Sequence, residues 1–136
     1  MDEREKPVIL CVDDDKRILA LLKDILEPEG YDLRFSLSEE DALLQMSVEV
    51  PDIILLDITL PGESGLELLK RIVKDERTKK VPVIMLTGSE EIKDAEEAMG
   101  LGAVSYINKP FNIDLLKSLI PGFLRKVKND GEQGTY

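Results

Sequence analysis

Residues 52–62 read DIILLDITLPG, a short run of Ile and Leu that leads into a carboxylate and then a Pro-Gly turn. A continuous apolar run without alternation is typical of a strand that is buried on both faces, as in a parallel sheet. The Pro-Gly pair ends such a strand abruptly. We therefore expect Asp57 at the carboxyl end of a strand, the edge where ligands bind in open α/β sheets. Taken alone, the stretch favours the simpler interpretation that Asp57 caps the next turn.

The composition describes a single acidic globular domain. The chain has 136 residues, of which 43% are hydrophobic and 34% charged, and its net charge is −10. This charge disfavours direct binding of nucleic acid. No apolar stretch is long enough to span a membrane, and the chain begins with the polar residues MDEREK, so we expect no membrane contact and a cytoplasmic location.

Two residue types narrow the chemistry further. The only cysteine, Cys11, lies in an apolar run and is expected in the core. The chain has no histidine, which excludes histidine metal ligands, histidine general bases and a phosphohistidine carried by this chain.

The apolar pattern alternates between strand and helix five times. Strand-like runs cover 8–12, 31–36, 52–57, 82–86 and 104–107, and helical spacing follows each of them at 18–26, 42–46, 66–73, 92–99 and 113–120. This order predicts a doubly wound α/β sandwich, a parallel five-stranded sheet with helices on both faces and right-handed crossovers. The flavodoxin-like (βα)5 fold, with strand order 2-1-3-4-5, is the natural choice for five such units.

Four of the five predicted strands end in residues suited to phosphoryl chemistry. Asp13 and Asp14 follow the first strand, Asp57 ends the third, Thr87 the fourth, and Lys109 follows the fifth. In a parallel sheet these ends lie along one edge, where the crowded carboxylates need a cation to neutralise them. Oxygen ligands without histidine or cysteine favour Mg²⁺. Thr87 supplies a hydroxyl donor, Lys109 a charge for a phosphoryl oxygen, and Asp57 a nucleophile.

The spaced motifs together identify a family resemblance. The segments VILCVDDD (8–15), DIILLDITLPGESG (52–65), VIMLTG (83–88) and YINKP (106–110) resemble those of a response-regulator receiver domain of two-component signalling, of the chemotaxis-receiver type. The resemblance predicts a receiver domain over residues 1–128 and a polar C-terminal tail over 129–136. It covers nearly the whole chain.

The resemblance implies a role for each residue of the acidic edge. Asp57 is the phosphoacceptor, which takes a phosphoryl group from a sensor histidine kinase or a histidine phosphotransfer protein. Asp13 and Asp14 hold Mg²⁺, joined by Asp57 and the backbone carbonyl of Thr59. Lys109 pairs with a phosphoryl oxygen. Asp15, by contrast, is expected to cap the first helix and not to bind the metal.

Further roles concern switching and the lifetime of the phosphoryl group. Thr87 hydrogen-bonds the phosphoryl group and moves on activation, and Tyr106 is the switch aromatic. Thr59 and Ser89 occupy the positions that tune dephosphorylation. The family usually has a cis peptide before the residue at Pro110.

The implied function is regulatory and not enzymatic, because the domain assists only its own phosphorylation and dephosphorylation. A downstream protein partner, or a second copy in a phosphorylation-dependent homodimer, would bind the face made by the fourth helix, the fifth strand and the last helix. We expect no direct contact with nucleic acid. Either the domain acts alone through such contacts or it belongs to a longer protein.

Three other interpretations of the sequence place different demands on these residues. A degenerate receiver could serve as a binding scaffold, but the set of Asp, Thr and Lys side chains is intact. A Mg²⁺-dependent aspartyl-phosphate hydrolase of the haloacid-dehalogenase type requires a second Asp two residues after the nucleophile, where this chain has Thr59. A flavin-binding module would require a glycine-rich phosphate loop after the first strand.

The last helix departs from the family pattern, because Pro121 and Gly122 fall inside it. An interior Pro removes a hydrogen bond and clashes with the preceding turn, at a cost of ~3 kcal/mol, and Gly adds roughly 1 kcal/mol. We therefore predict a helix over 112–119, a break, and a short second turn over 122–128. Alternatively, Pro121 occupies the first turn of that second helix, where its missing N–H does no harm.

Overall fold

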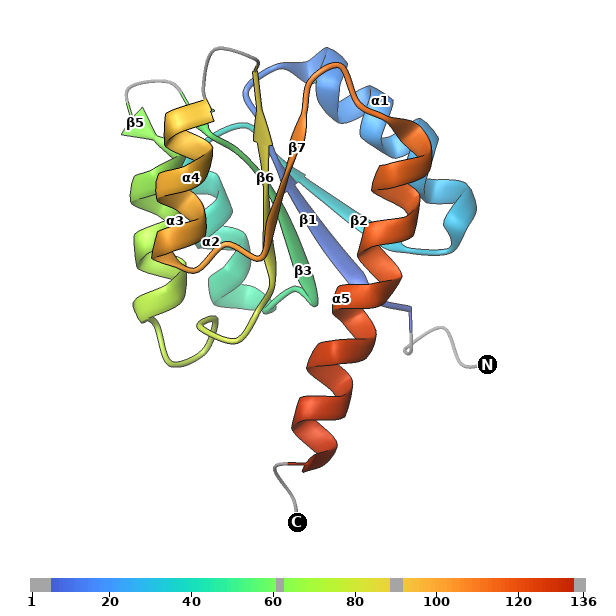
Figure 1. Ribbon diagram of the computed structural model, residues 1–136, viewed down its shortest axis with the longest axis vertical. Coiled ribbons are helices and arrows are strands. Elements are labelled where there is room, and N and C mark those ends of the chain that lie inside the picture. Colours follow the sequence, from blue (N-terminus) through green and yellow to red (C-terminus); the bar gives the residue numbers. More distant parts are fainter. Residues whose placement is uncertain (1–5, 61–62, 89–91, 134–136) are drawn as a thin grey trace.

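The computed structural model describes residues 6–60, 63–88 and 92–133, and its central feature is a parallel sheet (Figure 1). The strand order β2-β1-β3-β6-β7 is the predicted order 2-1-3-4-5 once the strands of this sheet are numbered along the chain. The five strands are β1 Val8–Val12, β2 Asp32–Ser36, β3 Ile53–Asp57, β6 Val83–Thr87 and β7 Ser105–Asn108. The predicted flavodoxin-like fold is confirmed.

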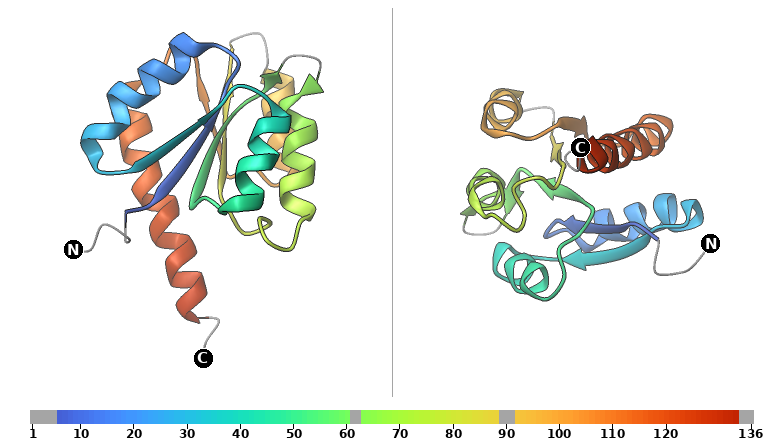
Figure 2. Two further views of the ribbon diagram at one scale, coloured as in Figure 1. Left: turned by 180° about the vertical axis from the view of Figure 1, so that it is seen from behind. Right: turned by 90° about the horizontal axis from the view of Figure 1, so that it is seen from below.

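Helices cover both faces of the sheet (Figure 2). Helices α2, α3 and α4 pack on one face, and α1 and α5 on the other. Their bounds are α1 Lys16–Leu26, α2 Glu39–Val48, α3 Gly65–Lys74, α4 Ile92–Leu101 and α5 Ile113–Gln133. No described helix has the length and apolar character needed to cross a bilayer.

Three short elements were not predicted. The 3-10 turn η2 Glu27–Glu29 follows α1, and Gly30 ends it with a φ of 92°, a left-handed conformation that favours glycine. Strands β4 Thr59–Leu60 and β5 Glu63–Ser64 pair antiparallel directly after β3. Elements of two or three residues are too short to produce a periodic pattern.

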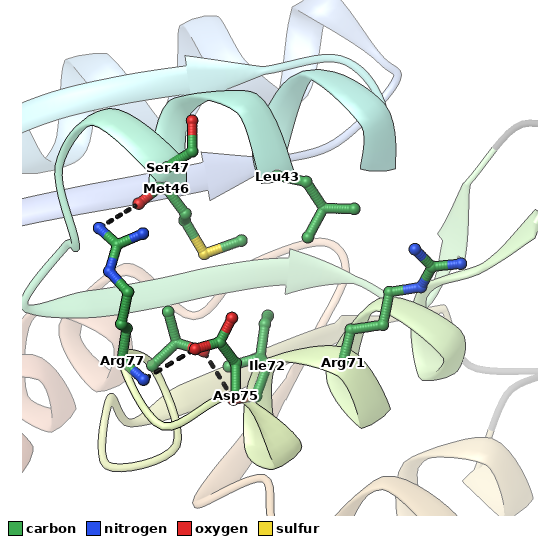
Figure 3. A pocket seen from close by; sticks show the side chains of 8 residues that line it. Leu43, Met46, Ser47, Arg71, Ile72, Asp75 and Arg77 are labelled. Carbon is green, nitrogen blue, oxygen red and sulfur yellow. Dashed lines mark hydrogen bonds between the residues drawn. The ribbon is translucent and has the colours of Figure 1, made fainter.

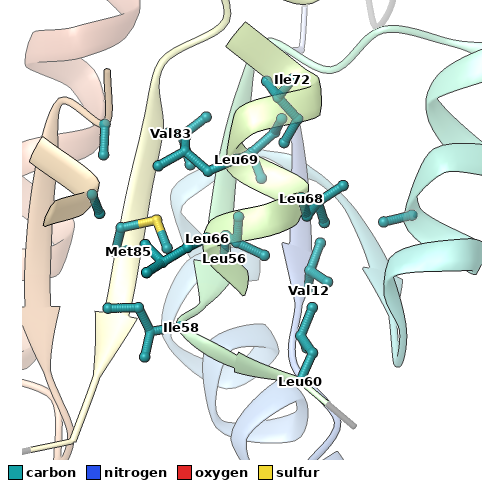
Figure 4. Close-up of a cluster of buried hydrophobic side chains, with 14 of the residues drawn as sticks. Val12, Leu56, Ile58, Leu60, Leu66, Leu68, Leu69, Ile72, Val83 and Met85 are labelled. Atoms are coloured by element: carbon teal, nitrogen blue, oxygen red, sulfur yellow. The ribbon is translucent and has the colours of Figure 1, made fainter. Parts of the chain in front are cut away.

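The core consists of two apolar layers separated by the sheet. All five residues of β3 are buried, as the unbroken apolar run predicts. Ile53 and Leu55 pack toward α1 and α5, whereas Ile54 and Leu56 pack toward the layer of α2, α3 and α4. Figure 4 shows the second layer, where Leu56 lies among side chains of α3 and β6. Cys11 is fully buried in the first layer, as predicted.

Side-chain caps define where the first helices begin. Asp15 Oδ1 accepts the backbone N–H of Arg17 at 2.9 Å, which confirms Asp15 as the cap of α1. Ser38 Oγ accepts the backbone N–H of Asp41 at 3.1 Å at the start of α2. These caps satisfy N–H groups that have no partner within the helix.

The predicted break in the last helix is wrong. Helix α5 runs from Ile113 to Gln133 with Pro121 inside it, and in Figure 1 it extends well past the sheet. Ile120 before Pro121 is fully buried, while Phe123 and Leu124 after it pack against the same apolar cluster. Because burial on both sides holds the helix in place, tertiary packing outweighs the local penalty of Pro121.

Candidate functional site

The residues that we predicted to form the functional site lie at the carboxyl ends of the strands or directly after them, at the upper edge of the sheet in Figure 1. Asp13 directly follows β1, Asp57 ends β3, Thr87 ends β6, and Lys109 directly follows β7. The side chains of Asp13 and Thr87 are fully buried, and Asp57 is only 5% exposed. The parallel topology therefore gathers polar groups from four strands into a largely buried cluster.

Lys109 joins the two buried carboxylates. Its Nζ lies 2.8 Å from Asp13 Oδ2 and 3.3 Å from Asp57 Oδ1. A buried carboxylate without a counter-charge is costly, and a single ammonium shared by two of them leaves net negative charge. The cluster therefore remains attractive to a further cation.

Backbone N–H groups fix the orientation of both carboxylates. Asp13 Oδ1 accepts the N–H of Asp15 at 2.9 Å, and Asp57 Oδ1 accepts the N–H of Thr59 at 3.2 Å. The chain beyond Asp57 is held to β6, because the N–H of Ile58 donates to the carbonyl of Leu86 at 3.0 Å. These bonds hold the turns after β1 and β3 against the edge of the sheet.

The surroundings of Asp57 shift its protonation strongly. Burial, followed by the negative charge of Asp13, raises the pKa of Asp57 to about 7, although Lys109 and the N–H of Thr59 act in the opposite direction. Burial lowers the pKa of Lys109, but its hydrogen bond and charge contact with Asp13 and its contact with Asp57 raise it overall. Burial, together with the charge of Asp13, therefore outweighs the stabilising effect of Lys109 on the ionised Asp57 carboxylate.

A divalent metal ion fits this donor set. One carboxylate oxygen from each of Asp13, Asp14 and Asp57 lies within 4.8 Å of the others, and Asp14 is exposed while the other two are buried. All donors are oxygens, which hard cations such as Mg²⁺ prefer, and the exposed side leaves room for water ligands. Thr59 lies beside this group, and the ligand role of its carbonyl stays a prediction.

Thr87 has a partner that was not predicted. Its Oγ1 donates to Asn108 Oδ1 at 3.0 Å. Thr87 and Asn108 are paired across β6 and β7. Asn108 directly precedes Lys109, and its position was therefore visible in the sequence. Its pairing with Thr87 depends on the register between the two strands, which the pattern of a single strand does not give.

Gly65 is a second residue whose structural role sequence reasoning missed. It begins α3, and its N–H donates to the carbonyl of Ile58 at 2.7 Å. A Cβ at this position would collide with the backbone carbonyl oxygen of Asp57. The close approach of α3 to the acceptor strand therefore requires glycine.

The other predicted residues are placed as follows. Tyr106 lies on β7 with 40% of its surface exposed, and its switch role stays a prediction. The peptide between Lys109 and Pro110 is cis, as expected. Ser89 lies outside the described residues, so its role in dephosphorylation also stays a prediction.

Comparison with known proteins agrees with this geometry. A family model described as the response regulator receiver domain matches residues 9–121. The phosphate regulon transcriptional regulatory protein PhoB of Rhizobium meliloti (strain 1021) is 34% identical over 122 residues, which cover 90% of this chain and 54% of that protein. The DNA-binding dual master transcriptional regulator RpaA of Synechocystis is 35% identical over 123 residues, covering 88% of this chain and 50% of that protein. The chain thus spans about half the length of the curated relatives it matches.

Solved structures show the same fold. A putative response regulator from Chloroflexus aurantiacus superposes with a TM-score of 0.85 at 33% identity, covering 89% of this chain and 99% of that one. NtrX from Brucella abortus superposes with a TM-score of 0.88 at 33% identity, covering 96% of this chain and 29% of that one. The family model, the relatives and the shared fold lead to one conclusion: the chain belongs to the family of response regulator receiver domains.

Proposed function

We propose that Asp57 accepts a phosphoryl group from a phosphohistidine of a sensor histidine kinase or a histidine phosphotransfer protein. The observation that carries this proposal is the position of the Asp57 carboxylate at the end of β3, with Lys109 Nζ 3.3 Å from its Oδ1. Receiver domains as a family receive phosphoryl groups from histidine kinases. This chain has no histidine, so the phosphohistidine must lie outside it.

The transfer is a substitution at phosphorus. A carboxylate oxygen of Asp57 forms the new O–P bond while the P–N bond of the donor breaks, and the electron pair of that bond stays on the imidazole nitrogen. The ammonium of Lys109, already between two carboxylates, stabilises the charge on the phosphoryl oxygens. Asp57 must be ionised to attack.

Mg²⁺ completes the proposed site. Asp13, Asp14 and Asp57 would hold it, together with the backbone carbonyl of Thr59, and when bound it supplies positive charge to the phosphoryl oxygens. Asp13 would also keep Lys109 oriented toward the acceptor, since the two side chains are 2.8 Å apart.

Phosphorylation would then change the surface of the domain. The product adds about −1.5 to −2 charges to a small buried site. The hydroxyl of Thr87 gains a new acceptor there in place of Asn108, and Tyr106 on the same strand as Asn108 would change position with it. The output would be the face formed by α4, β7 and α5, which would bind a downstream protein or a second copy in a phosphorylation-dependent homodimer.

The domain acts as a regulator and not as an enzyme with its own substrate. Two of its relatives are named as transcriptional regulators, and one of these as DNA-binding. We propose no direct contact between this domain and nucleic acid, because its net charge is −10.

Incubation with acetyl phosphate and Mg²⁺ tests the proposal. The protein should gain one hydroxylamine-labile acyl phosphate, and Asp57→Asn should abolish it, while the matched surface change Asp24→Asn should leave it intact. A scaffold would take up no phosphoryl group, and a hydrolase would turn over acetyl phosphate continuously. A labile phosphoryl group on the Asp57→Asn protein would show that Asp57 is not the acceptor.

A further inference from the structure

The second half of α3 and the turn that follows it are cationic in an otherwise acidic protein. Residues 70–80 contain six cations and two carboxylates, whereas the whole chain has 18 cations and 28 carboxylates. The cations are Lys70, Arg71, Lys74, Arg77, Lys79 and Lys80, and we call them the cationic strip. A net charge of +4 in this short segment contrasts with −10 for the chain.

A cavity of about 280 Å³ adjoins this strip, between α2 and α3 (Figure 3). Its apolar lining comes from Leu43 and Met46 of α2 and Ile72 of α3, while the side chains of Arg71 and Arg77 lie on opposite sides of it. The cavity is large enough to receive one aliphatic or aromatic side chain. Its lining combines an apolar floor with two guanidinium groups.

Both arginines keep N–H groups available for a ligand. Arg77 donates one N–H from Nη2 to the carbonyl of Met46 at 3.2 Å, and a guanidinium has five such donors. Arg71 is 60% exposed, and its Nε lies 3.8 Å from Glu39 Oε1. Asp75 also lines the cavity, but its Oδ1 accepts the backbone N–H of Arg77 at 2.8 Å, which ties it to the turn.

Exposed apolar residues extend the surface along α2. Leu44 is 64% exposed and Val48 is 83% exposed, and their spacing of four places them on the same side of the helix. They are the next residues after Leu43 and Ser47, which line the cavity. Apolar side chains beside a charged rim are typical of a protein interaction surface.

We propose that the groove between α2 and α3 binds an acidic segment of a partner protein, with an apolar side chain in the cavity and carboxylates on Arg71 and Arg77. Guanidinium groups pair with carboxylates through two parallel hydrogen bonds, which gives this recognition its geometry. Two further cations of the same segment, Lys74 and Lys80, have no carboxylate partner in the described part of the chain. Several cations in one short segment favour an acidic peptide with more than one carboxylate over a small anion.

The apolar features distinguish a protein partner from nucleic acid. A phosphate backbone would use the cations but would leave the floor of the cavity, Leu44 and Val48 without a role. The cavity lies along the second half of α3, on the side that faces α2. The acceptor site adjoins the opposite end of the same helix, where its first residue, Gly65, lies against Asp57. Binding there therefore does not require the acceptor site.

A library of random short peptides displayed on phage tests the proposal. Selection on the intact protein should enrich sequences in which Asp or Glu flank Leu, Ile or Phe. An enriched peptide, added to ¹⁵N-labelled protein, should shift the amide signals of Met46, Ile72 and Thr78. The double change Arg71→Glu/Arg77→Glu should weaken binding by about tenfold or more, whereas Lys23→Glu/Lys93→Glu, with the same change in net charge, should alter it less than about twofold.

A second pair of changes separates folding from binding. Leu44→Ser/Val48→Ser alters only exposed side chains. This double change should also weaken binding of the peptide, while the temperature of thermal unfolding stays unchanged. Phosphorylation of the arginine variant by acetyl phosphate should stay at the wild-type level, so a failure here is distinguishable from a failure of the acceptor site. Enrichment of peptides without acidic residues, signals that shift elsewhere, or tighter binding of a DNA duplex to the cationic strip would overturn the proposal.

Discussion

The hydroxyl of Thr87 donates a 3.0 Å hydrogen bond to the side-chain oxygen of Asn108 on the neighbouring strand. Thr87 is fully buried, and a buried hydroxyl needs such a partner. A phosphoryl group on Asp57 would offer a competing acceptor. Asn108 therefore stabilises the unphosphorylated arrangement of Thr87.

Asn108→Ala should shift the domain toward its phosphorylated state. The change removes a hydrogen bond that is worth about 1 kcal/mol from the unphosphorylated state alone. The concentration of acetyl phosphate that gives half-maximal phosphorylation should fall by roughly fivefold, as that free energy implies. Asn112→Ala, which removes an Asn side chain that caps α5, is the control and should leave this concentration unchanged. An unchanged value for Asn108→Ala would remove Asn108 from the switch.

Gly65→Ala should destabilise the protein and disturb the acceptor. The new Cβ would overlap the carbonyl oxygen of Asp57, so that the backbone must move, at a cost of about 1–3 kcal/mol. Gly122→Ala is the matched control, because nothing lies within 4 Å of its Cβ position, and it should raise stability by roughly 1 kcal/mol. Urea unfolding measures both changes. Equal stability of the two variants would show that α3 can move away from β3 freely.

The fold was predictable because the three central strands, β1, β3 and β6, are short and almost wholly apolar. The run before Asp57 is buried on both faces, as in the interior of a parallel sheet, and the polar residue at its end marks the edge of the sheet. The continuity of α5 was not predictable, since the contacts of Phe123 and Leu124 that hold it come from distant strands and helices. Local penalties at Pro121 are visible in the sequence, whereas the packing that outweighs them is not.

The functional site also contains residues that were predictable from the sequence and relationships that were not. Asp13, Asp57, Thr87 and Lys109 were predicted because each stands at the end of an apolar run, where topology alone gathers them. The Asn108 partner of Thr87 depends on the register of β6 against β7, and the requirement for Gly65 depends on how closely α3 approaches β3. Both are relationships between elements, which a single-strand pattern does not contain.

The raised pKa of Asp57 predicts how the stability of the metal-free protein changes with pH. The pKa is about 7 in the folded protein and about 3.8 unfolded, so the folded state binds a proton that the unfolded state has lost between these values. The contribution of Asp57 to the free energy of unfolding therefore falls as pH rises from about 4 to about 7, by at most about 4 kcal/mol. The change Asp57→Asn removes the ionisable group, and with it this decrease in the free energy of unfolding.

In EDTA, the stability advantage of Asp57→Asn over the wild type should grow from pH 4 to pH 7 and then level off. When the two proteins are compared by urea unfolding at each pH, the contributions of the other titrating groups to the free energy of unfolding cancel. The largest difference is expected above pH 7, where the wild-type carboxylates are most crowded. A difference that stays constant across this range would contradict the burial and charge effects assigned to Asp57.

Asp14 and Asp15 are adjacent in sequence but should respond differently to substitution. Asp14 offers an oxygen to the group formed with Asp13 and Asp57, whereas Asp15 caps α1 and pairs with Arg17 at 3.1 Å. Asp14→Ala should weaken Mg²⁺ binding by about tenfold or more, because it removes one of a few charged ligands. Asp15→Ala should instead lower the free energy of unfolding by about 1 kcal/mol and leave Mg²⁺ affinity nearly unchanged. Calorimetric Mg²⁺ titration and urea unfolding of both variants separate the two roles, and equal losses of affinity would show that the acidic cluster is wrongly assigned.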